Sequence, residues 1–562
     1  MAEYRKIGGN NVAMQAVLKN GAIYVTDCFR EKNLLKSIQG RRWDAKTKAW
    51  VVPTTVDTID ALRTIPGRMD SQILHVYERL KQLREDTYTE KLAEHVKPIE
   101  PMPLIKNIKP FQHQIKAYNM ALMNNSFAFL MEMGTGKSLT AVAVAARRYL
   151  RREVCRVLIV APTSVCPVWP KEFEAALVMK RVAILEGPIV KRIQILNELS
   201  EWTNHLQIAV INYEATWRML DNLIAWKPDM IICDESQRIK NPSAKQSKAL
   251  HKLGKVARYK LILSGTPVQN APLDFFSQYK FLDDRVFGTS YYAFRARYAR
   301  MGGYGNHQVV AYQNLDELIQ KAHSIAYRVT KAEALDLPEQ VDEFRYCELE
   351  PKTQSLYKEI KEESYAELEN GEVTVRNVLT KLLRLQQITG GYLKTDEGIE
   401  KHVSDAKLNV LQEIVTDIVD AGKKVVIFAR FIKEIDAIRS MMDKLKIQYS
   451  WIAGEVPIPE RGEKVKQFQE NPECKVFIAQ IQTAGLGITL HAADTAVFYS
   501  VDFNYANYSQ ARARIHRIGQ KNNCTYIHLL AKGTIDEKVM EALQKKEDMA
   551  KMVVDNWRIY FK

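Results

Sequence analysis

Paired cysteines, export signals and long apolar runs are all missing from this sequence. Its seven cysteines are scattered through 562 residues and form no C-x-x-C pair, which argues against a zinc ribbon and against a disulfide framework. No apolar run is long enough to cross a bilayer, and the opening residues, MAEYRKIGGNN, lack the apolar core of a signal peptide. We therefore expect an intracellular, soluble protein without zinc or a membrane segment, cytoplasmic in a bacterium or its virus and nuclear in a eukaryote.

The composition also lacks the marks of disorder, because no long block of like charge occurs and hydrophobic residues make up 46% of the chain. A chain of 562 residues is too long for one compact core, so several domains are expected. One sign of charge is in excess, since the formal net charge is +15. A positive excess favours a polyanionic partner, because neutralising phosphates releases condensed counterions.

Short apolar runs alternate with helical patterns along most of the chain, and this rhythm predicts parallel sheets covered by helices. The runs expected to form strands include VLIVAP, IAVINY, DMIICDE and LILSG in one part, and KVVIFAR, KVFIAQ, AVFYS and YIHLLA in a later part. A Pro-punctuated stretch, 98–110, indicates an extended linker after a small N-terminal unit. Charged, helix-favouring residues such as KEIKEESYAELEN separate the two α/β parts. The predicted domains are therefore 1–97, 98–336, a helical 337–404, and 405–562.

A glycine-rich turn joins the apolar run SFAFL to the helical pattern that follows it. Glycines let backbone amides approach phosphate oxygens, a lysine can reach the β- and γ-phosphates, and a serine hydroxyl can ligate Mg²⁺. The phosphate-binding residues predicted in this turn are Gly134, Thr135, Gly136, Lys137 and Ser138. The longer form of the motif would place a glycine where Met131 stands, so only the short G-x-G-K-S form is present. Taken alone, the turn could be a strand-to-helix connection that carries its lysine by chance.

Two adjacent acids, Asp234 and Glu235, end the apolar run DMIICDE further along the chain. We predict that Asp234, together with Ser138, holds Mg²⁺ and that Glu235 orients and deprotonates the attacking water. Phosphoryl transfer depends mainly on such positioning and on charge neutralisation. An isolated acid pair can also cap a helix, but the acid pair and the phosphate loop together indicate ATP hydrolysis.

Beyond these two motifs, segment after segment resembles the Swi/Snf-type ATPases of helicase superfamily two, in the same order and over most of the chain. The segments that carry the resemblance in the first lobe are IKPFQHQ, VLIVAPTSVCPVWPKEF, DESQRIKN and LILSGTPVQN. The resemblance implies that Gln112 reads the adenine. It also implies that Ser264, Gly265 and Thr266 couple the ATP site to the nucleic-acid groove. Gln237 stands where histidine is common in the family, and this departure bears on coupling rather than on hydrolysis.

Two further segments, TAGLGITLHAADTAVFYSVDFN and YSQARARIHRIGQ, resemble the family's motifs in the second lobe. By that match Arg514 and Arg517 are arginine fingers, which bring planar positive charge to the γ-phosphate across the cleft. Gly485 would contact nucleic acid, and Gln510 would help to couple the lobes. Without the resemblance, QARARIHR would indicate a solvated helix face or a generic phosphate-contacting patch.

Basic residues and tryptophans are interleaved in REKNLLKSIQGRRWDAKTKAW, which holds seven Lys or Arg residues against two acids. Such mixing suits phosphate contact combined with base stacking. RRWDAKTKAWVVP also resembles the small accessory module beside the motor in the annealing-helicase, or HARP-type, branch of the family. The predicted DNA-binding residues are Arg41, Arg42, Trp43, Lys46, Lys48 and Trp50. Alternatively, both tryptophans form the core of a small hairpin domain with lysines on its outside, and the two interpretations are compatible.

The resemblance implies two doubly wound RecA-like parallel-sheet lobes with a helical insertion and a small α+β N-terminal domain, with ATP and Mg²⁺ between the lobes. It implies a DNA-stimulated ATPase that moves along or remodels duplex or forked DNA. Two alternatives stay open: a strand-separating DNA helicase, and a DNA-binding module that uses ATP as a switch without hydrolysing it. Intact Lys137, Glu235 and Arg517 count against the second alternative. The sequence indicates no particular protein partner.

Overall fold

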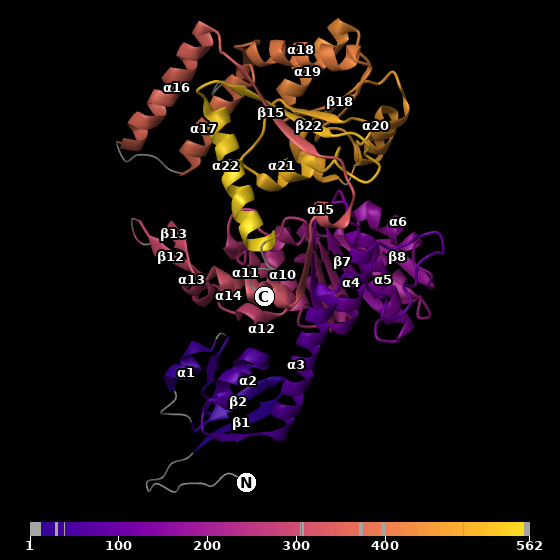
Figure 1. Cartoon of the computed structure of the whole chain (residues 1–562), viewed down its shortest axis with the longest axis vertical. Coiled ribbons are helices and arrows are strands. Elements are labelled where there is room, and N and C mark those ends of the chain that lie inside the picture. The colour runs from indigo at the N-terminus through magenta and orange to yellow at the C-terminus, as the bar shows by residue number, and fades with distance from the viewer. Residues whose placement is uncertain are drawn as a thin grey trace.

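The computed structural model describes residues 13–27, 32–38, 40–303, 305, 308–369, 375–394, 400–486 and 488–555. An N-terminal unit, a first α/β lobe and a second α/β lobe follow one another along the long axis of the molecule (Figure 1). The last helix, α22 (Ile535–Ala550), leaves the second lobe and runs toward the first. Just after it, Val553 and Val554 are buried in the core of the first lobe. The end of the described chain therefore ties the two lobes together.

The N-terminal unit is a five-stranded sheet with the strand order β3-β4-β2-β1-β5, packed against helices. Its elements are β1 (Met14–Lys19), β2 (Ala22–Thr26), α1 (Lys32–Ser37), β3 (Arg42–Asp44), β4 (Ala49–Pro53), α2 (Val56–Arg63), β5 (Gly67–Met69) and α3 (Ser71–Leu92). Strands and helices both contribute apolar side chains to one small core. This arrangement confirms the predicted α+β class of the unit.

Helix α3 belongs to the N-terminal unit and to the first lobe at once. Ile73 and Tyr77 near its start are buried in the N-terminal core. Lys91 in its last turn is only 6% exposed, and its ammonium donates to the backbone carbonyl of His323 at 2.6 Å. The linker that follows, 98–110, forms no helix and contains an isolated bridge at Leu104 and a turn at 106–107. The boundary predicted at residue 97 thus lies after a helix that is already docked on the first lobe.

Seven parallel strands form the sheet of the first lobe, in the order β14-β6-β11-β10-β7-β9-β8. The strands are β6 (Ser126–Met131), β7 (Arg156–Ala161), β8 (Lys180–Ile184), β9 (Leu206–Asn212), β10 (Met230–Asp234), β11 (Tyr259–Leu263) and β14 (Ala326–Val329). The helices are α4 (Gln112–Met123), α5 (Lys137–Leu150), α6 (Trp169–Glu174), α7 (Ile189–Ser200), α8 (Tyr213–Thr216), α9 (Leu220–Trp226), α10 (Lys245–Leu253), α11 (Phe275–Leu282), α12 (Asp284–Phe287), α13 (Tyr291–Tyr298), α14 (Leu315–Ser324) and α15 (Lys331–Ala334). A hairpin, β12 (Ala299–Gly302) and β13 (Gln308–Tyr312), projects from the lobe. Helices cover both faces of the sheet, and this explains why central strands such as β10 are buried along their whole length.

Six parallel strands form the sheet of the second lobe, in the order β15-β22-β21-β18-β20-β19. The strands are β15 (Gln340–Cys347), β18 (Val425–Ala429), β19 (Tyr449–Ile452), β20 (Val476–Gln480), β21 (Thr495–Phe498) and β22 (Cys524–Ala531). The helices besides α22 are α16 (Pro351–Glu369), α17 (Val375–Thr389), α18 (Ala406–Asp420), α19 (Ile432–Leu445), α20 (Ile458–Glu470) and α21 (Tyr505–Arg512). The prediction of two parallel-sheet lobes is confirmed.

The segment predicted to be a helical insertion, 337–404, is only partly helical. It begins with β15, which pairs with β22 at the edge of the second sheet, and it ends in the hairpin β16 (Tyr392–Lys394) and β17 (Glu400–His402). Ile388 of α17 is fully buried in the core of the second lobe. The sequence QVDEFRYC did not reveal β15, because an edge strand buries few side chains. Its polar residues interrupt the apolar pattern that would predict a strand. The segment is therefore part of the second lobe.

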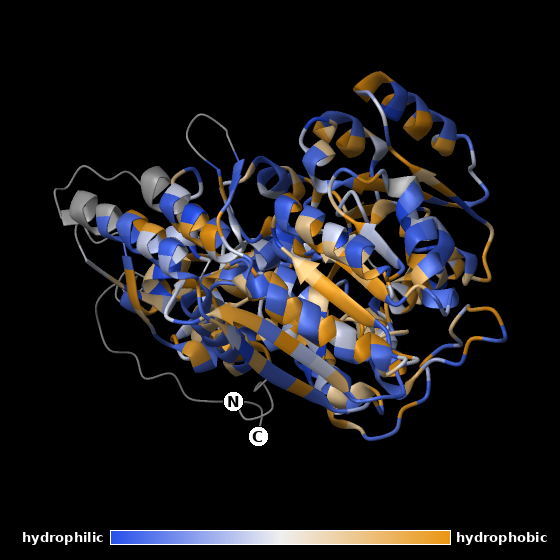
Figure 2. Cartoon of the chain, turned by 90° about the horizontal axis from the view of Figure 1, so that it is seen from above, coloured by the Kyte–Doolittle hydropathy of each residue, from blue (hydrophilic) through white to orange (hydrophobic). Residues whose placement is uncertain are grey.

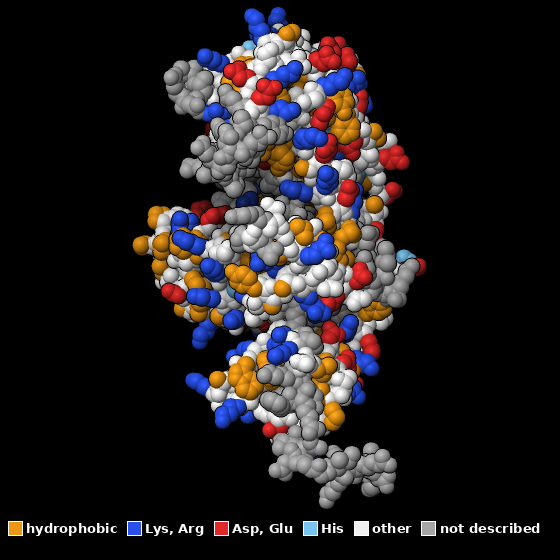
Figure 3. Space-filling model, turned by 90° about the vertical axis from the view of Figure 1, so that its left-hand side faces the viewer, with side chains coloured by type: hydrophobic (Ala, Val, Ile, Leu, Met, Phe, Trp, Pro, Cys, Tyr) orange, Lys and Arg blue, Asp and Glu red, His pale blue; other side chains and the backbone are white. Residues whose placement is uncertain are grey.

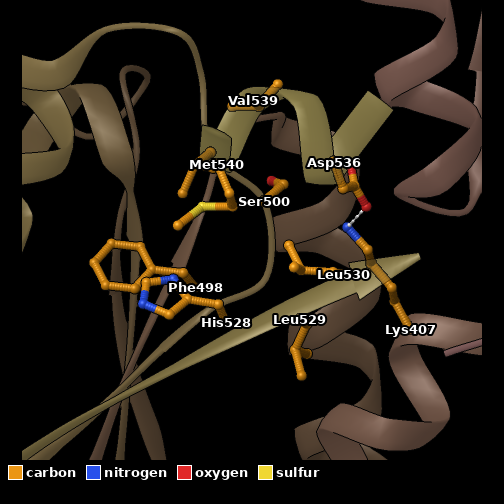
Figure 4. A pocket seen from close by; sticks show the side chains of 10 residues that line it. Lys407, Phe498, Ser500, His528, Leu529, Leu530, Asp536, Val539 and Met540 are labelled. Carbon is orange, nitrogen blue, oxygen red and sulfur yellow. Dashed lines mark ion pairs between the residues drawn. The ribbon is translucent and has the colours of Figure 1, made fainter. Parts of the chain in front are cut away.

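Hydrophobic residues gather in the strands and on the inward faces of the helices, as Figure 2 shows. One charged pair breaks this rule in the second lobe, where the ammonium of Lys407 lies 2.6 Å from the carboxylate of Asp536 (Figure 4). Asp536 also accepts a hydrogen bond from the Thr389 hydroxyl at 2.9 Å, so the pair joins three helices. The cavity beside it measures about 10 Å³, which is room for one water at most. The pair is therefore structural. Across the described ranges, every helix is too short or too polar to cross a bilayer.

Candidate nucleotide site between the lobes

The phosphate loop lies between β6 and α5 in a conformation that requires glycine at two positions. Gly134 and Gly136 have φ values of 84° and 83°, in the left-handed region that disfavours other residues. Space is also lacking at Gly136, because an added β-carbon would clash with Nε2 of Gln114. Thr135 between them is fully buried. Its carbonyl accepts hydrogen bonds from Nε2 of His113 at 2.8 Å and from Nε2 of Gln114 at 3.2 Å. Side chains of helix α4 thus fix the position of the phosphate loop.

Lys137 begins α5, and its side chain turns back over the end of β6. Its ammonium donates to the carbonyls of Met131 at 2.9 Å and Glu132 at 3.2 Å. Burial lowers the pKa of Lys137, while the charges of Glu235 and Asp234 oppose that shift. The amine of Lys137 therefore lies at the loop, within the electrostatic reach of the two acids predicted to act with it.

The acid pair occupies the carboxyl end of β10, at the same edge of the sheet as the loop. Asp234 is 7% exposed, and its carboxylate accepts the backbone N–H of Glu235 at 2.9 Å. Burial, and then the neighbouring charge of Glu235, raise the pKa of Asp234 to about 7, while Lys137 lowers it. Glu235 adopts a left-handed backbone conformation with φ of 51°, a strained arrangement of the kind found at functional sites.

Gln237 connects the acid pair to the segment predicted to couple ATP and DNA. Its Nε2 donates to the carboxylate of Glu235, and its Oε1 accepts the hydroxyl of Ser264 at 2.7 Å. Ser264 in turn accepts the backbone N–H of Thr266 at 3.1 Å. Gly265 lies against the phosphate loop, because a β-carbon there would meet the backbone nitrogen of Met133 at 3.2 Å. The glutamine found in place of histidine therefore still joins the acid to the coupling segment.

The two predicted arginine fingers come from the second lobe, just after α21, and lie beside the phosphate loop of the first. Arg517 Cγ is 3.5 Å from the position of a β-carbon added at Gly134, and Nη1 of Arg517 donates to the hydroxyl of Thr489 at 3.0 Å. Arg514 is 7% exposed. Burial and the charge of Arg517 lower the pKa of Arg514 to about 10, and Glu235 opposes the shift. The structure thus brings residues of both lobes to one site.

For three predicted residues, the described side chains show no contact with this site. Gln112 is exposed, and its Oε1 accepts the backbone N–H of Val96 at 2.9 Å, so its assignment to the adenine stays a prediction. Gln510 is half-buried on α21. Gly485 belongs to the 3-10 segment Ile481–Leu486, and its surroundings lie outside the described side chains.

The structure places around the loop four residues to which the sequence assigns no role, namely His113, Gln114, Glu172 and Lys331. The first two follow Gln112 in the segment IKPFQHQ and could have been found from it. Burial raises the pKa of Glu172, while Arg517 opposes that shift. Lys331 lies outside every motif that we quoted, so no sequence signal identified it.

The predicted accessory residues form a surface on the N-terminal unit. Arg41, Arg42, Lys46 and Lys48 are exposed, and Trp43 is 53% exposed. Trp50 is half-buried and packs against the N-terminal core. The two rings contact each other edge to face, with centroids 5.3 Å apart. Trp50 thus fits the alternative interpretation as a core residue, whereas Trp43 is free to contact a ligand. Figure 3 shows Lys and Arg side chains beside hydrophobic ones on one face of this unit.

This geometry defines a class, a two-lobed protein in which the phosphate loop of one lobe meets arginines of the other. Comparison with known families agrees, because the SNF2-related domain matches residues 111–390 and the helicase conserved C-terminal domain matches residues 406–519. The chain belongs to the Swi/Snf family of helicase superfamily two. Both matched ranges begin after the N-terminal unit, so its resemblance to the HARP-type module stays a prediction.

Several curated proteins are similar to the chain. An uncharacterized ATP-dependent helicase of Mycoplasma genitalium is 25% identical over 80% of this chain and 42% of its own length. A homolog of SWI/SNF-related matrix-associated actin-dependent regulator of chromatin subfamily A-like protein 1 from Caenorhabditis elegans is 28% identical over 92% of this chain and 72% of its own. The DNA repair and recombination protein RDH54 of Saccharomyces cerevisiae is 26% identical over 70% of this chain and 44% of its own. The chain thus spans less than half the length of the M. genitalium and S. cerevisiae relatives.

Among solved structures, the Sulfolobus solfataricus SWI2/SNF2 ATPase core in complex with dsDNA is 26% identical. The match covers 82% of this chain and 95% of that one, with a TM-score of 0.40.

Proposed function

We propose that this chain is a DNA-stimulated ATPase that uses hydrolysis to move along duplex DNA. The observation that supports the proposal most strongly is the close approach of Arg517 Cγ to Gly134, 3.5 Å from the position of a β-carbon there. Half of the nucleotide site thus belongs to each lobe. Such a site closes and opens with the motion of its lobes, so hydrolysis can be converted into stepping.

The residues around the loop divide the chemistry of hydrolysis among them. The amides of the loop and Lys137 bind the β- and γ-phosphates. Glu235 orients the attacking water and takes its proton on a carboxylate oxygen. Arg514 and Arg517 place guanidinium charge where negative charge accumulates on the transferred phosphoryl group.

Asp234 and Ser138 fit a Mg²⁺ ion. Their oxygens are the donor type that this cation prefers. Moreover, burial and the charge of Glu235 raise the pKa of Asp234, as expected of a carboxylate that a bound cation would stabilise. Mg²⁺ would neutralise charge on the β- and γ-phosphates.

Coupling to DNA runs through Gln237 in this proposal. A shift of Glu235 during hydrolysis is passed by Gln237 to Ser264, since Gln237 hydrogen-bonds both residues. Two hydrogen-bonded contacts in series make a short path from the acid to the coupling segment.

A DNA partner is supported by the net charge of +15 and by the names of relatives, which include a DNA repair and recombination protein. The exposed basic surface around Trp43 supports a further role, the selection of forked or partly single-stranded DNA by the N-terminal unit. Strand separation is not required by either role.

Displacement of a third strand from a triplex tests movement along a duplex. We expect the full-length protein with ATP to release the third strand, and to release little strand from a forked duplex. Efficient unwinding of the fork without release of the third strand would favour a strand-separating helicase. Binding without phosphate release would favour an ATP-switched binding module.

A further inference from the structure

We propose that Lys331 is a positioning residue that aims the arginine fingers at the nucleotide phosphates. The inference rests on the proposed ATPase function and adds to it a residue outside the quoted motifs. Lys331 opens α15, the short helix with which the first lobe ends before the chain crosses to β15 of the second. It thus occupies the connection between the lobes.

The backbone of Lys331 is fixed to the phosphate-loop side of the site. Its N–H donates to the carboxylate of Glu132 at 2.8 Å, and Glu132 stands two residues before Gly134. A capping box formed by Thr330 and Glu333 holds the first turn of α15 in place. The base of the Lys331 side chain is therefore immobilised relative to the loop.

The ammonium of Lys331 binds the opposite lobe. It donates to the backbone carbonyl of His516 at 2.7 Å, and His516 stands between Arg514 and Arg517 in the chain. The Nε2 of His516 donates to the carbonyl of Pro338 at 2.8 Å, which also lies in the connection between the lobes. The turn that carries both arginines is thus held at two points by the segment that follows the first lobe.

The Lys331 side chain also lies over the phosphate loop. Its Cε is 3.8 Å from the position of a β-carbon added at Gly134, and Arg517 Cγ is 3.5 Å from that same position. Lys331 is only 4% exposed, and its hydrogen bond to His516 therefore links the arginine turn directly to a side chain that lies over the loop.

The charges around Lys331 indicate that it belongs to a polyanion site. Burial, together with the charges of Arg514, Arg517 and Lys137, lowers the pKa of Lys331 to about 8, and Glu132 opposes the shift. Four cations brought together in a buried site repel one another, and a ligand with several negative charges, such as a triphosphate, relieves that repulsion.

Lys91 offers a matched control for a purely structural lysine. It is 6% exposed, and its ammonium also donates to a histidine backbone carbonyl, that of His323, at 2.6 Å. It lies where α3 docks on the first lobe, and its partner His323 belongs to α14 rather than to the phosphate loop. Replacing either lysine with methionine keeps the aliphatic stem and removes the ammonium together with its hydrogen bond to a histidine carbonyl.

The experiment measures kcat, the KM for ATP and the thermal midpoint of the full-length variants Lys331→Met and Lys91→Met. Lys331→Met should lower kcat by about 10- to 100-fold with KM changed by less than about threefold, because misplaced catalytic groups cost turnover rather than substrate binding. Lys91→Met should lower the thermal midpoint to a similar extent and keep the wild-type kcat.

A double-mutant cycle then asks whether Lys331 acts through an arginine finger. In the Arg517→Ala background, Lys331→Met should lower kcat by a clearly smaller factor than in the wild-type protein, since one of the two arginines it positions is already gone. The inference is overturned if Lys331→Met keeps the wild-type kcat, or if its full effect persists without Arg517. An inactive wild-type protein would instead refute the proposed ATPase function, and this role with it.

Discussion

The two halves of the nucleotide site are held in different ways. In the first lobe, Thr135 is fully buried and its carbonyl accepts two hydrogen bonds from α4. In the second lobe, Arg514 donates to the Ile488 carbonyl at 3.3 Å, and its buried Nε has no hydrogen-bond partner within the described residues. The first half is therefore fixed by hydrogen bonds from its own lobe, whereas Arg514 in the second half keeps a buried donor that the described residues leave unsatisfied.

Removing an arginine finger should distinguish the contributions of the two halves to turnover and to nucleotide binding most clearly. Arg517→Ala should lower ATP turnover by about three orders of magnitude or more, the contribution of arginine fingers in phosphoryl transfer. Nucleotide affinity should change little, because the phosphate loop in the first lobe is untouched. Phosphate release and the binding of a fluorescent ATP analogue measure the two effects. Arg514→Ala should behave alike, and normal turnover in either variant would mean that its arginine contacts only DNA or solvent.

Disabling the water-orienting acid tests the first half by itself. Glu235→Gln should lower turnover by about 100-fold or more, because a general base is lost while the charge of Asp234 remains. Glu473→Gln, on an exposed loop, is the control and should keep wild-type turnover. Wild-type phosphate release by Glu235→Gln would remove Glu235 from the mechanism.

Breaking the connection at Gln237 should have a smaller effect. Gln237→Ala removes hydrogen bonds to Glu235 and Ser264. If their loss raises the activation free energy by about 1.4 kcal/mol, the rate of ATP turnover falls roughly tenfold. Third-strand displacement should fall more than phosphate release, since coupling is lost in addition to alignment of the acid. Equal losses in both assays would mean that Gln237 only aligns Glu235.

The smallest effect is expected in the N-terminal unit. Replacing Arg41, Arg42, Lys46 and Lys48 with alanine should keep basal ATP turnover and weaken the preference for forked over plain duplex DNA. If each contacts a phosphate, the slope of log affinity against log salt should become less steep by roughly 3 to 4. Competition between the two DNAs at matched salt measures the preference. An unchanged preference and slope would leave these residues as solvated surface.

Substitution tests this unit better than removal of residues 1–97. That truncation would delete α3, whose Lys91 is buried against the first lobe, and would therefore damage the lobe as well. The sequence showed the Pro-rich linker, but it could not show that the helix before the linker is docked, because docking depends on contacts between segments far apart in the chain.

The parts of the fold that the sequence predicted are those with strong local signals. Buried parallel strands such as β10 are continuous apolar runs, so both sheets could be predicted. β15 could not, because it is an edge strand with only Cys347 buried. The glycines and Lys137 follow from phosphate chemistry, whereas Lys331 reaches the loop only through the folding of the first lobe's last helix. A residue that is placed at a site only by tertiary folding shows no local sequence pattern.

The most direct test of the central claim is phosphate release by the full-length protein with and without duplex DNA, at matched ionic strength. The account predicts Mg²⁺-dependent ATP hydrolysis that duplex DNA stimulates, and loss of that stimulated rate in Arg517→Ala. Hydrolysis that duplex DNA leaves unchanged, or that Arg517→Ala leaves intact, would contradict a motor whose ATP site is completed by its second lobe.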